Sequence, residues 1–228
     1  MKNNFRIKVT KDGPYVISGK IPLAKEKIVP DKKGDPLEWQ KIEDFPEKEG
    51  YALCRCGNSS NKPYCDGSHI KTKFKGAETA DNDKYNTRAK KIDGPDLILR
   101  DLPELCVHAR FCDRAGGIWD LTAKSNDSNA KKIAIQEACN CPSGRLVIID
   151  KKTGREIEPD LKQSISLVED QKAGVSGPLW IKGRIPIESA DGSTYEVRNR
   201  ATLCRCGKSK NKPFCDGTHI SIGFQDKG

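Results

Sequence analysis

The sequence predicts an α+β protein in which two small β-rich units flank a segment of a different kind. Three observations point to this class. Only 35% of the 228 residues are hydrophobic and 32% are charged, which argues against one large core. A block of sequence near the N-terminus recurs near the C-terminus. The segment between the two copies combines apolar residues at helical spacing with short strand patterns.

The repeat divides the chain. LCRCGNSSNKPYCDGSHI at 53–70 recurs as LCRCGKSKNKPFCDGTHI at 203–220. Upstream, GPYVISGKIPL recurs as GPLWIKGRIPI, and each copy is typical of a β-strand entered from a Gly-Pro turn. The first copy holds extra residues at 29–46, which we interpret as an inserted loop. We therefore expect a first module at 1–76, a linker and middle domain at 77–170, and a second module at 171–228.

The middle segment shows its own elements. PDLILRD predicts a strand, and AKKIAIQEAC has the apolar spacing of a helix. RLVIIDKKTGREI predicts a hairpin, and SISLVED at 164–170 predicts a further strand. We expect this domain to be α+β.

Charge and cysteine usage limit the classes of partner. The net charge is +9, but the lysines are scattered among acidic residues, so the pattern favours an acidic protein partner over nucleic acid. The N-terminus has no apolar region of a signal peptide, and no run approaches the length of a membrane span. We therefore expect a cytoplasmic protein, without membrane contact, whose ten cysteines stay reduced and bind metal.

The repeated block contains four candidate metal ligands at the spacing C-x-C-x8-C-x3-H. Two cysteines one residue apart on an extended strand point to the same face, with Cα atoms about 6.6 Å apart, so both thiolates can bind one metal ion. Asp66 follows the third cysteine and is a candidate helix N-cap, from which Cys65 and His69 can converge on a second ion. The ligand sets are Cys54, Cys56, Cys65 and His69 in the first copy, and Cys204, Cys206, Cys215 and His219 in the second.

Three uses of these cysteines compete. A disulfide framework does not need a histidine at a fixed offset, and each copy has an odd number of cysteines. A structural zinc site is the serious rival, because three cysteines and one histidine are a known zinc ligand set. Zinc ligands usually come as C-x2–4-C pairs, however, and C-x-C is tighter. The spacing favours iron–sulfur over zinc.

Both copies resemble the CDGSH iron–sulfur (NEET-type) family, whose signature C-x-C-x2-[ST]-x3-P-x-C-D-G-[SAT]-H they match without departure. The resemblance implies two redox-active [2Fe–2S] clusters, with the C-x-C pair on the inner iron and the third cysteine with the histidine on the outer iron. A chain with two copies is similar to tandem members, in which one chain forms its own pseudo-dimer. We therefore expect a monomer.

The middle segment holds a third candidate site. CVHARFC and the later CPSG place Cys106, Cys112 and Cys141 in a ferredoxin-like order, with Ala109 where a regular four-iron motif has a cysteine. These residues would hold a [3Fe–4S] cluster, or a [4Fe–4S] cluster with an unusual fourth ligand. The segment resembles the divergent mono-cluster ferredoxin domain. Cys139 is a possible extra ligand or a small buried hydrophobe, and a reduced-cysteine core without metal is the alternative.

These features predict a multi-cluster protein for one-electron transfer or iron–sulfur cluster donation to an unknown redox or cluster-accepting partner. We do not expect this protein to be an enzyme, because the chain has no G-x-G-x-x-G motif and no phosphate-binding loop. His108 is the only histidine outside the two ligand sets, and we interpret it as structural. The alternatives are a zinc-stapled binding module, with nucleic acid as its target, and a redox-sensing regulatory subunit.

Overall fold

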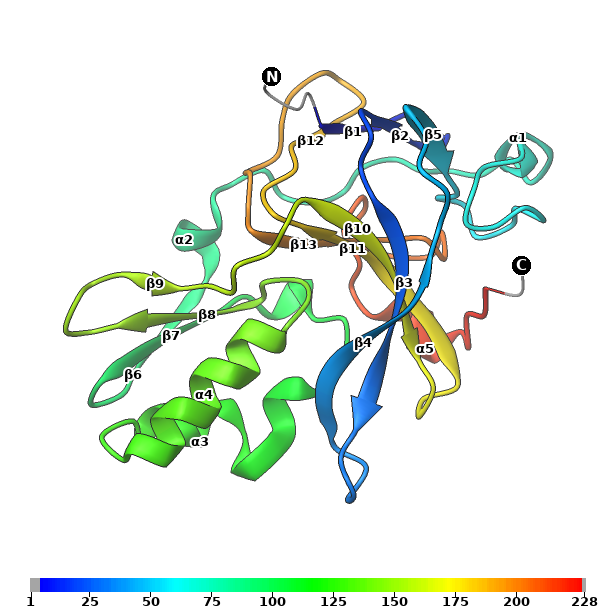
Figure 1. The fold of residues 1–228 in the computed structure, drawn as a ribbon. Helices are drawn as coiled ribbons and strands as arrows, with labels where there is room; N and C mark the ends of the chain where they lie inside the picture. The colour runs from blue at the N-terminus through cyan, green and yellow to red at the C-terminus, as the bar shows by residue number, and fades with distance from the viewer. Residues whose placement is uncertain (1–4, 227–228) are drawn as a thin grey trace.

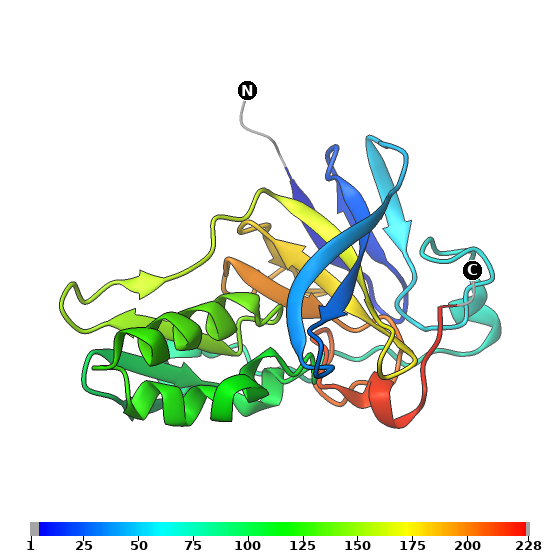
Figure 2. The same ribbon diagram turned by 60° about the horizontal axis from the view of Figure 1, so that its bottom comes forward.

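The computed structural model describes residues 5–226, and within this range the strands form three sheets. Two of the sheets pack together as one unit, and the third forms a separate layer with two helices (Figure 1). Figure 2 shows the helices and their sheet beside the strands of the first unit. The chain is therefore a mixed α/β protein.

The first sheet has the order β12-β1-β2-β5. It consists of β1 (Arg6–Val9), β2 (Tyr15–Ser18), β5 (Gly50–Leu53) and β12 (Ile187–Glu188). The second sheet has the order β13-β11-β10-β3-β4. It consists of β3 (Leu23–Pro30), β4 (Pro36–Asp44), β10 (Ser164–Asp170), β11 (Val175–Lys182) and β13 (Arg200–Leu203).

The two repeats exchange a strand. After its Gly-Pro strand, each repeat sends the next strand into the sheet of the other repeat, where it pairs in parallel with the first strand of that sheet. Ile7 lies opposite Ile187 in one sheet, and Ile165 lies opposite Leu23 in the other. The amide of Ile7 donates to Pro186 O at 3.0 Å, and the amide of Ile165 donates to Pro22 O at 2.9 Å. The repeats thus pair within one chain through two equivalent contacts.

A shared core lies between these two sheets. β1 and β2 alternate buried and more exposed side chains, whereas β11 is buried along almost its whole length, and the core side chains of both repeats are mostly aliphatic. Tyr15 is fully buried there, and its hydroxyl donates to Cys204 O at 2.8 Å and to Pro213 O at 3.0 Å. A side chain of the first repeat thereby holds the backbone of the second repeat's motif.

The middle domain has its own sheet and core. Its strands are β6 (Lys90–Asp93), β7 (Leu97–Asp101), β8 (Leu146–Asp150) and β9 (Glu156–Ile157). Helices α3 (Ile118–Ala123) and α4 (Ser128–Asn140) pack on it, and Asp127 caps α4 by accepting from the amide of Ala130. The strand, the helix and the hairpin expected from this part of the sequence are confirmed. A short helix, α2 (Tyr85–Arg88), precedes the sheet, and two 3₁₀ segments, η1 (Pro103–Leu105) and the kinked η2 (Phe111–Gly116), lie between β7 and α3.

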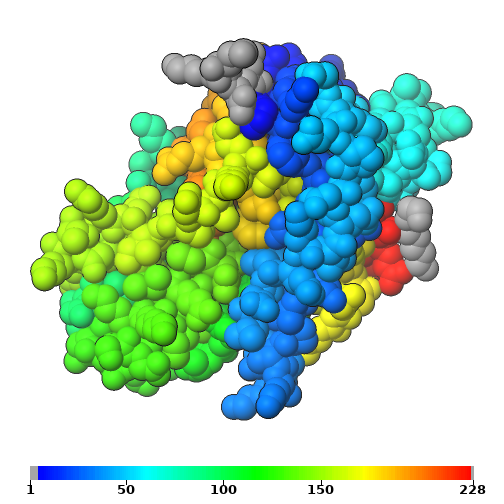
Figure 3. Space-filling model, viewed as in Figure 1, coloured from blue at the N-terminus to red at the C-terminus, as the bar shows by residue number. Residues whose placement is uncertain are grey.

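The expected loop at 29–46 is wrong, because these residues form most of the β3–β4 hairpin. The turn is closed by Asp31, whose carboxylate accepts from the amides of Lys33 and Asp35. β4 is an edge strand with most of its side chains in solvent, so its charged sequence lacks the alternation that marks a half-buried strand. The hairpin lies against the middle domain (Figure 3), where Trp39 donates from Nε1 to Asn140 O and packs on Phe111.

The strand at 164–170 is present as β10, and it pairs with β11 and β3 rather than with the sheet of the middle domain. It precedes residue 171, where we expected the second module to begin. Within residues 5–226, none of the helices has the length and apolar character needed to cross a bilayer.

Candidate metal centres

The first motif brings its two leading thiols together at the end of β5. Cys54 and Cys56 are both buried, and their Sγ atoms lie 3.7 Å apart. A tetrahedral metal ion with metal–sulfur bonds of about 2.3 Å separates two thiolates by about 3.8 Å. The loop then returns beside the strand, because the amide of Cys65 donates to Ala52 O at 2.9 Å. The spacing of this pair therefore suits one metal ion.

The second pair of the motif is one sulfur and one imidazole nitrogen. Cys65 Sγ lies 3.4 Å from His69 Nδ1, on either side of the left-handed Gly67. The helix N-cap is Gly67 and not Asp66, since α1 (Ser68–Lys71) is a single turn that begins after the glycine. The Asp66 carboxylate instead accepts from the amide of Ser68 and from Ser60, and these bonds lower its pKa. Asp66 thus ties the turn to the loop.

The second motif repeats this geometry. Cys204 and Cys206 have their Sγ atoms 3.7 Å apart, and Cys215 Sγ lies 3.3 Å from His219 Nδ1 at the start of α5 (Thr218–Ser221). The amide of Gly217 donates to Cys215 Sγ at 3.5 Å. Within the described part of the chain, no three histidine, cysteine or acidic side chains gather around one ion position. Each motif therefore presents two ligand pairs.

Burial prepares these side chains for metal binding. It lowers the pKa of His219 to about 4, so the ring is neutral at pH 7 and keeps a lone pair for a metal. The contact between the two thiols lowers the pKa of Cys204, while the same contact and burial raise the pKa of Cys206. Burial also raises the pKa of Cys215. A bound cation would stabilise the thiolates that burial disfavours.

The three cysteines singled out in the middle domain share one cavity, although they do not surround a single ion position. Cys106, Cys112 and Cys141 line one small cavity, together with Ala109. Burial raises the pKa of Cys112, and the other two thiols contribute to the same rise. Cys139 does not line this cavity, and its Sγ points to Ile157 O at 4.0 Å. All ten cysteines of the chain are free thiols.

The two CDGSH-like sites differ in exposure, although their sequences are nearly identical. Cys65 and His69 are partly exposed at the first site. At the second site Cys215 is 2% exposed and His219 is 3% exposed. The difference follows from the middle domain, whose Cys106–Arg110 loop covers the second site, with Arg110 paired to Asp170 at 2.7 Å.

Buried arginines around the sites were not anticipated from the sequence. Arg55 and Arg205 stand between the paired cysteines of the two motifs and point away from the thiols, toward backbone carbonyls such as Thr10 O and Gly177 O. The sequence feature that could have indicated them is the arginine at the same position in both copies of the motif. Arg200 is 1% exposed and reaches into the middle domain. The first repeat has Gly50 at the equivalent position, and this difference between the copies could have indicated a special role for Arg200.

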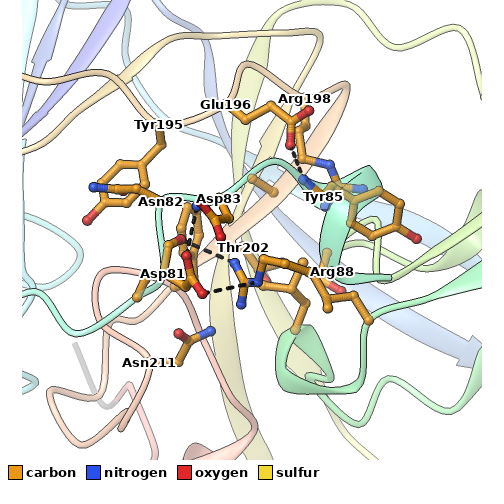
Figure 4. Close-up of a pocket in the computed structure, with 16 residues that line it drawn as sticks. Asp81, Asn82, Asp83, Tyr85, Arg88, Tyr195, Glu196, Arg198, Thr202 and Asn211 are labelled. Carbon is orange, nitrogen blue, oxygen red and sulfur yellow. Dashed lines mark hydrogen bonds and ion pairs between the residues drawn. The ribbon is translucent and has the colours of Figure 1, made fainter. Parts of the chain in front are cut away.

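A separate pocket lies between the linker, the middle domain and the second repeat (Figure 4). Arg88 pairs with Asp81 on one side, and the amide of Tyr85 donates to Glu196 on another. No cysteine or histidine lines it. The pocket nevertheless adjoins the middle site, because Ser143, which lines it, lies 3.6 Å from Cys141 Sγ.

Comparison with protein families finds two matching models along the chain. The family model described as iron-binding zinc finger CDGSH type matches residues 12–70 and 176–220. The model described as divergent 4Fe-4S mono-cluster matches residues 92–151. No curated protein and no solved structure matches the chain. The chain thus consists of two CDGSH iron-binding zinc finger regions that flank a divergent 4Fe-4S mono-cluster domain. These domains indicate an iron–sulfur protein.

Proposed function

We propose that this protein is a multi-cluster iron–sulfur carrier that transfers single electrons, or donates clusters, to a partner protein. The observation that carries the proposal is the sorting of each motif's ligands into two pairs, one of two sulfurs and one of sulfur and nitrogen. A [2Fe–2S] cluster takes two protein ligands on each iron. A mononuclear zinc site would instead need all four ligands around one ion.

The ligand assignment follows the pairs. In the first motif, Cys54 and Cys56 hold the inner iron, and Cys65 and His69 hold the outer iron. The second motif repeats this, with Cys204 and Cys206 on one iron and Cys215 and His219 on the other. A bound cluster supplies a centre that gains and loses one electron, and the chain's residues hold it and control its exposure.

The middle domain holds the third cluster on Cys106, Cys112 and Cys141. Three converging thiols with Ala109 at the missing position suit a [3Fe–4S] cluster, or a [4Fe–4S] cluster whose fourth ligand is not a cysteine. Cys139 is outside this set because its sulfur faces a backbone carbonyl of β9. The description of the matching family favours the four-iron form.

The partner is an acidic redox or cluster-accepting protein. The net charge of +9 favours such a surface, while the dispersed lysines give no stripe for nucleic acid. The chain acts as a carrier rather than as an enzyme with its own substrate, and it is monomeric because its repeats pair with each other. A cytoplasmic location stays a prediction, based on the free thiols.

Iron and acid-labile sulfide analysis tests the proposal, combined with EPR on protein purified with and without oxygen. We expect about seven or eight iron atoms per chain, with matching sulfide for the clusters described. Reduced protein should show signals from two kinds of cluster. Colourless protein with near-stoichiometric zinc would overturn the proposal and favour the zinc-stapled module.

A further inference from the structure

The three sites lie in an order in space that differs from their order in the sequence. In Figures 1 and 2, α1 of the first motif and the helices α3 and α4 of the middle domain lie toward opposite ends of the molecule. α5 of the second motif lies between them in both views. The second motif is therefore last along the chain but central in the fold.

The first and second motifs touch through their glycines. A Cβ placed on Gly57 would lie 2.6 Å from Cys206 O, and one on Gly207 would lie 3.1 Å from Cys56 Cα. Only glycine allows this approach. Cys56 and Cys206 each belong to a candidate ligand pair, so the backbones of the two sites are in direct contact.

The second motif touches the middle site on its other side. A Cβ placed on Gly217 would lie 2.8 Å from His108 Nε2 and 3.1 Å from Cys106 O. Gly217 separates Cys215 from His219, and Cys106 lines the cavity of the middle site. In the first motif, the equivalent Gly67 has no atom within 4 Å of the same position. One motif is in contact with the middle domain, and the other is open.

We propose that the second motif holds the central site of a three-site electron relay, with the middle-domain site and the first motif's site as its two ends. The inference rests on the proposed function. The central site is the buried one, with Cys215 and His219 at 2% and 3% exposure. The cysteines of the middle site and the Cys65–His69 edge of the first site are partly exposed, which suits ends that meet separate partners.

The ligands of the sites indicate the direction of electron transfer between the middle domain and the two motifs. A neutral histidine in place of a thiolate makes a site less negative and easier to reduce, whereas the three ligands assigned at the middle site are all thiolates. A low-potential one-electron donor protein thus reduces the middle site. That site is reoxidised as the second site is reduced. The second and first sites have the same ligand types, so the direction between them comes from exposure: water around the partly exposed first site favours the added electron there, and the second site is reoxidised as the first is reduced. A one-electron acceptor protein takes the electron from the first site, and no bond or proton changes place.

Radiolytic reduction in frozen solution tests the relay without an external partner. Electrons trapped in the oxidised protein at low temperature move to the most easily reduced site on annealing, and EPR follows each site. Variants that lack one ligand set provide the reference spectra. We expect the middle-site signal to decay while the first-site signal grows. This growth should be lost when Cys215→Ala and His219→Ala remove the second site's outer ligand pair.

A glycine pair supplies a second variant and its control. Gly217 and Gly67 have φ of 84° and 85°, so alanine strains the backbone equally at both positions. Only Gly217→Ala pushes against His108 and the Cys106 backbone. Because the strain is equal at both positions, we expect Gly217→Ala to slow the decay of the middle-site signal more than Gly67→Ala does. Iron and sulfide content is measured in every variant.

The outcomes separate the two proposals. Undiminished transfer from the middle to the first site without the second ligand pair would overturn the relay and leave the iron–sulfur function standing. Equal transfer in the two glycine variants would also overturn the relay. Wild-type protein without iron and sulfide would overturn the proposed function, and the relay with it.

Discussion

Replacing Arg200 by methionine should destabilise the protein and empty the middle site first. The guanidinium is buried and joins the second repeat to the middle domain. It pairs with the Glu158 carboxylate at 2.7 and 2.8 Å and donates to four backbone carbonyls, at Ala138, Cys139, Cys141 and Leu146. The first three of these lie at the C-terminal end of α4, where a positive charge also interacts favourably with the helix dipole.

The magnitude follows from what the substitution leaves behind. Removing one partner of a buried ion pair costs about 3 to 5 kcal/mol, because the other charge loses its compensation. In a protein of this size each kcal/mol lowers the thermal midpoint by about 2 to 4 °C, so Arg200→Met should lower it by about 10 °C. Because Cys141 O loses its donor, iron should be lost from the middle site before the CDGSH sites.

The assay is thermal unfolding by circular dichroism, with iron and EPR signals measured for each site. Arg184→Met is the control, since Arg184 is exposed and surface changes usually stay within about 0.5 kcal/mol. Adding Glu158→Leu to Arg200→Met should recover part of the loss. If Arg200→Met unfolds at the temperature of the control and keeps its middle-site iron, the argument from the buried pair is wrong.

Four further predictions concern the ligands of the middle site, the buried Glu137, cluster removal and the oligomeric state. Cys141→Ala should abolish the EPR signal of the middle site and Cys139→Ala should keep it; the opposite result would reverse the ligand assignment. Burial raises the pKa of Glu137 to about 8 against 4.5 in the unfolded chain, so the native state binds the extra proton and loses stability as pH rises between these values. In urea unfolding, Glu137→Gln should therefore be more stable than wild type at pH 8.5, by up to about 5 kcal/mol, with little difference at pH 4.5. An iron chelator should remove the cluster at partly exposed His69 before the one at buried His219, as resolved by EPR over time; simultaneous loss would contradict this. Light scattering should give the monomer mass of 25.3 kDa, and a dimer alone would show that the repeats pair between chains.

The local parts of the sites could be predicted from the sequence because their geometry depends on short spacing. Cys54 and Cys56 lie close together as their short spacing predicts, although β5 ends at Leu53 and the backbone bends at Cys56 instead of continuing as the expected strand; Cys65 and His69 meet across one turn. The grouping of Cys106, Cys112 and Cys141 without Cys139 follows from the ferredoxin-like order. In each case the information lies within a short stretch or a recognisable motif.

The non-local parts could not be predicted. The β3–β4 hairpin has a charged edge strand, which carries little of the hydrophobic alternation that indicates a strand. The parallel pairs β1–β12 and β3–β10 join segments far apart in the chain, and nothing in either segment alone specifies its partner. The role of Arg200 depends on carbonyls that only the folded middle domain brings together.

The difference between the two CDGSH motifs shows how an insertion can give two copies of one motif separate roles. Gly67 and Gly217 have the same backbone conformation, and their motifs place cysteine and histidine at matching distances. The inserted domain covers only one of them, because the loop with His108 packs on Gly217 while the position beside Gly67 stays open. Burial at one site limits access by water and partners, and exposure at the other permits it. The ligands would set the kind of cluster at both motifs, and tertiary contacts would set which one meets a partner.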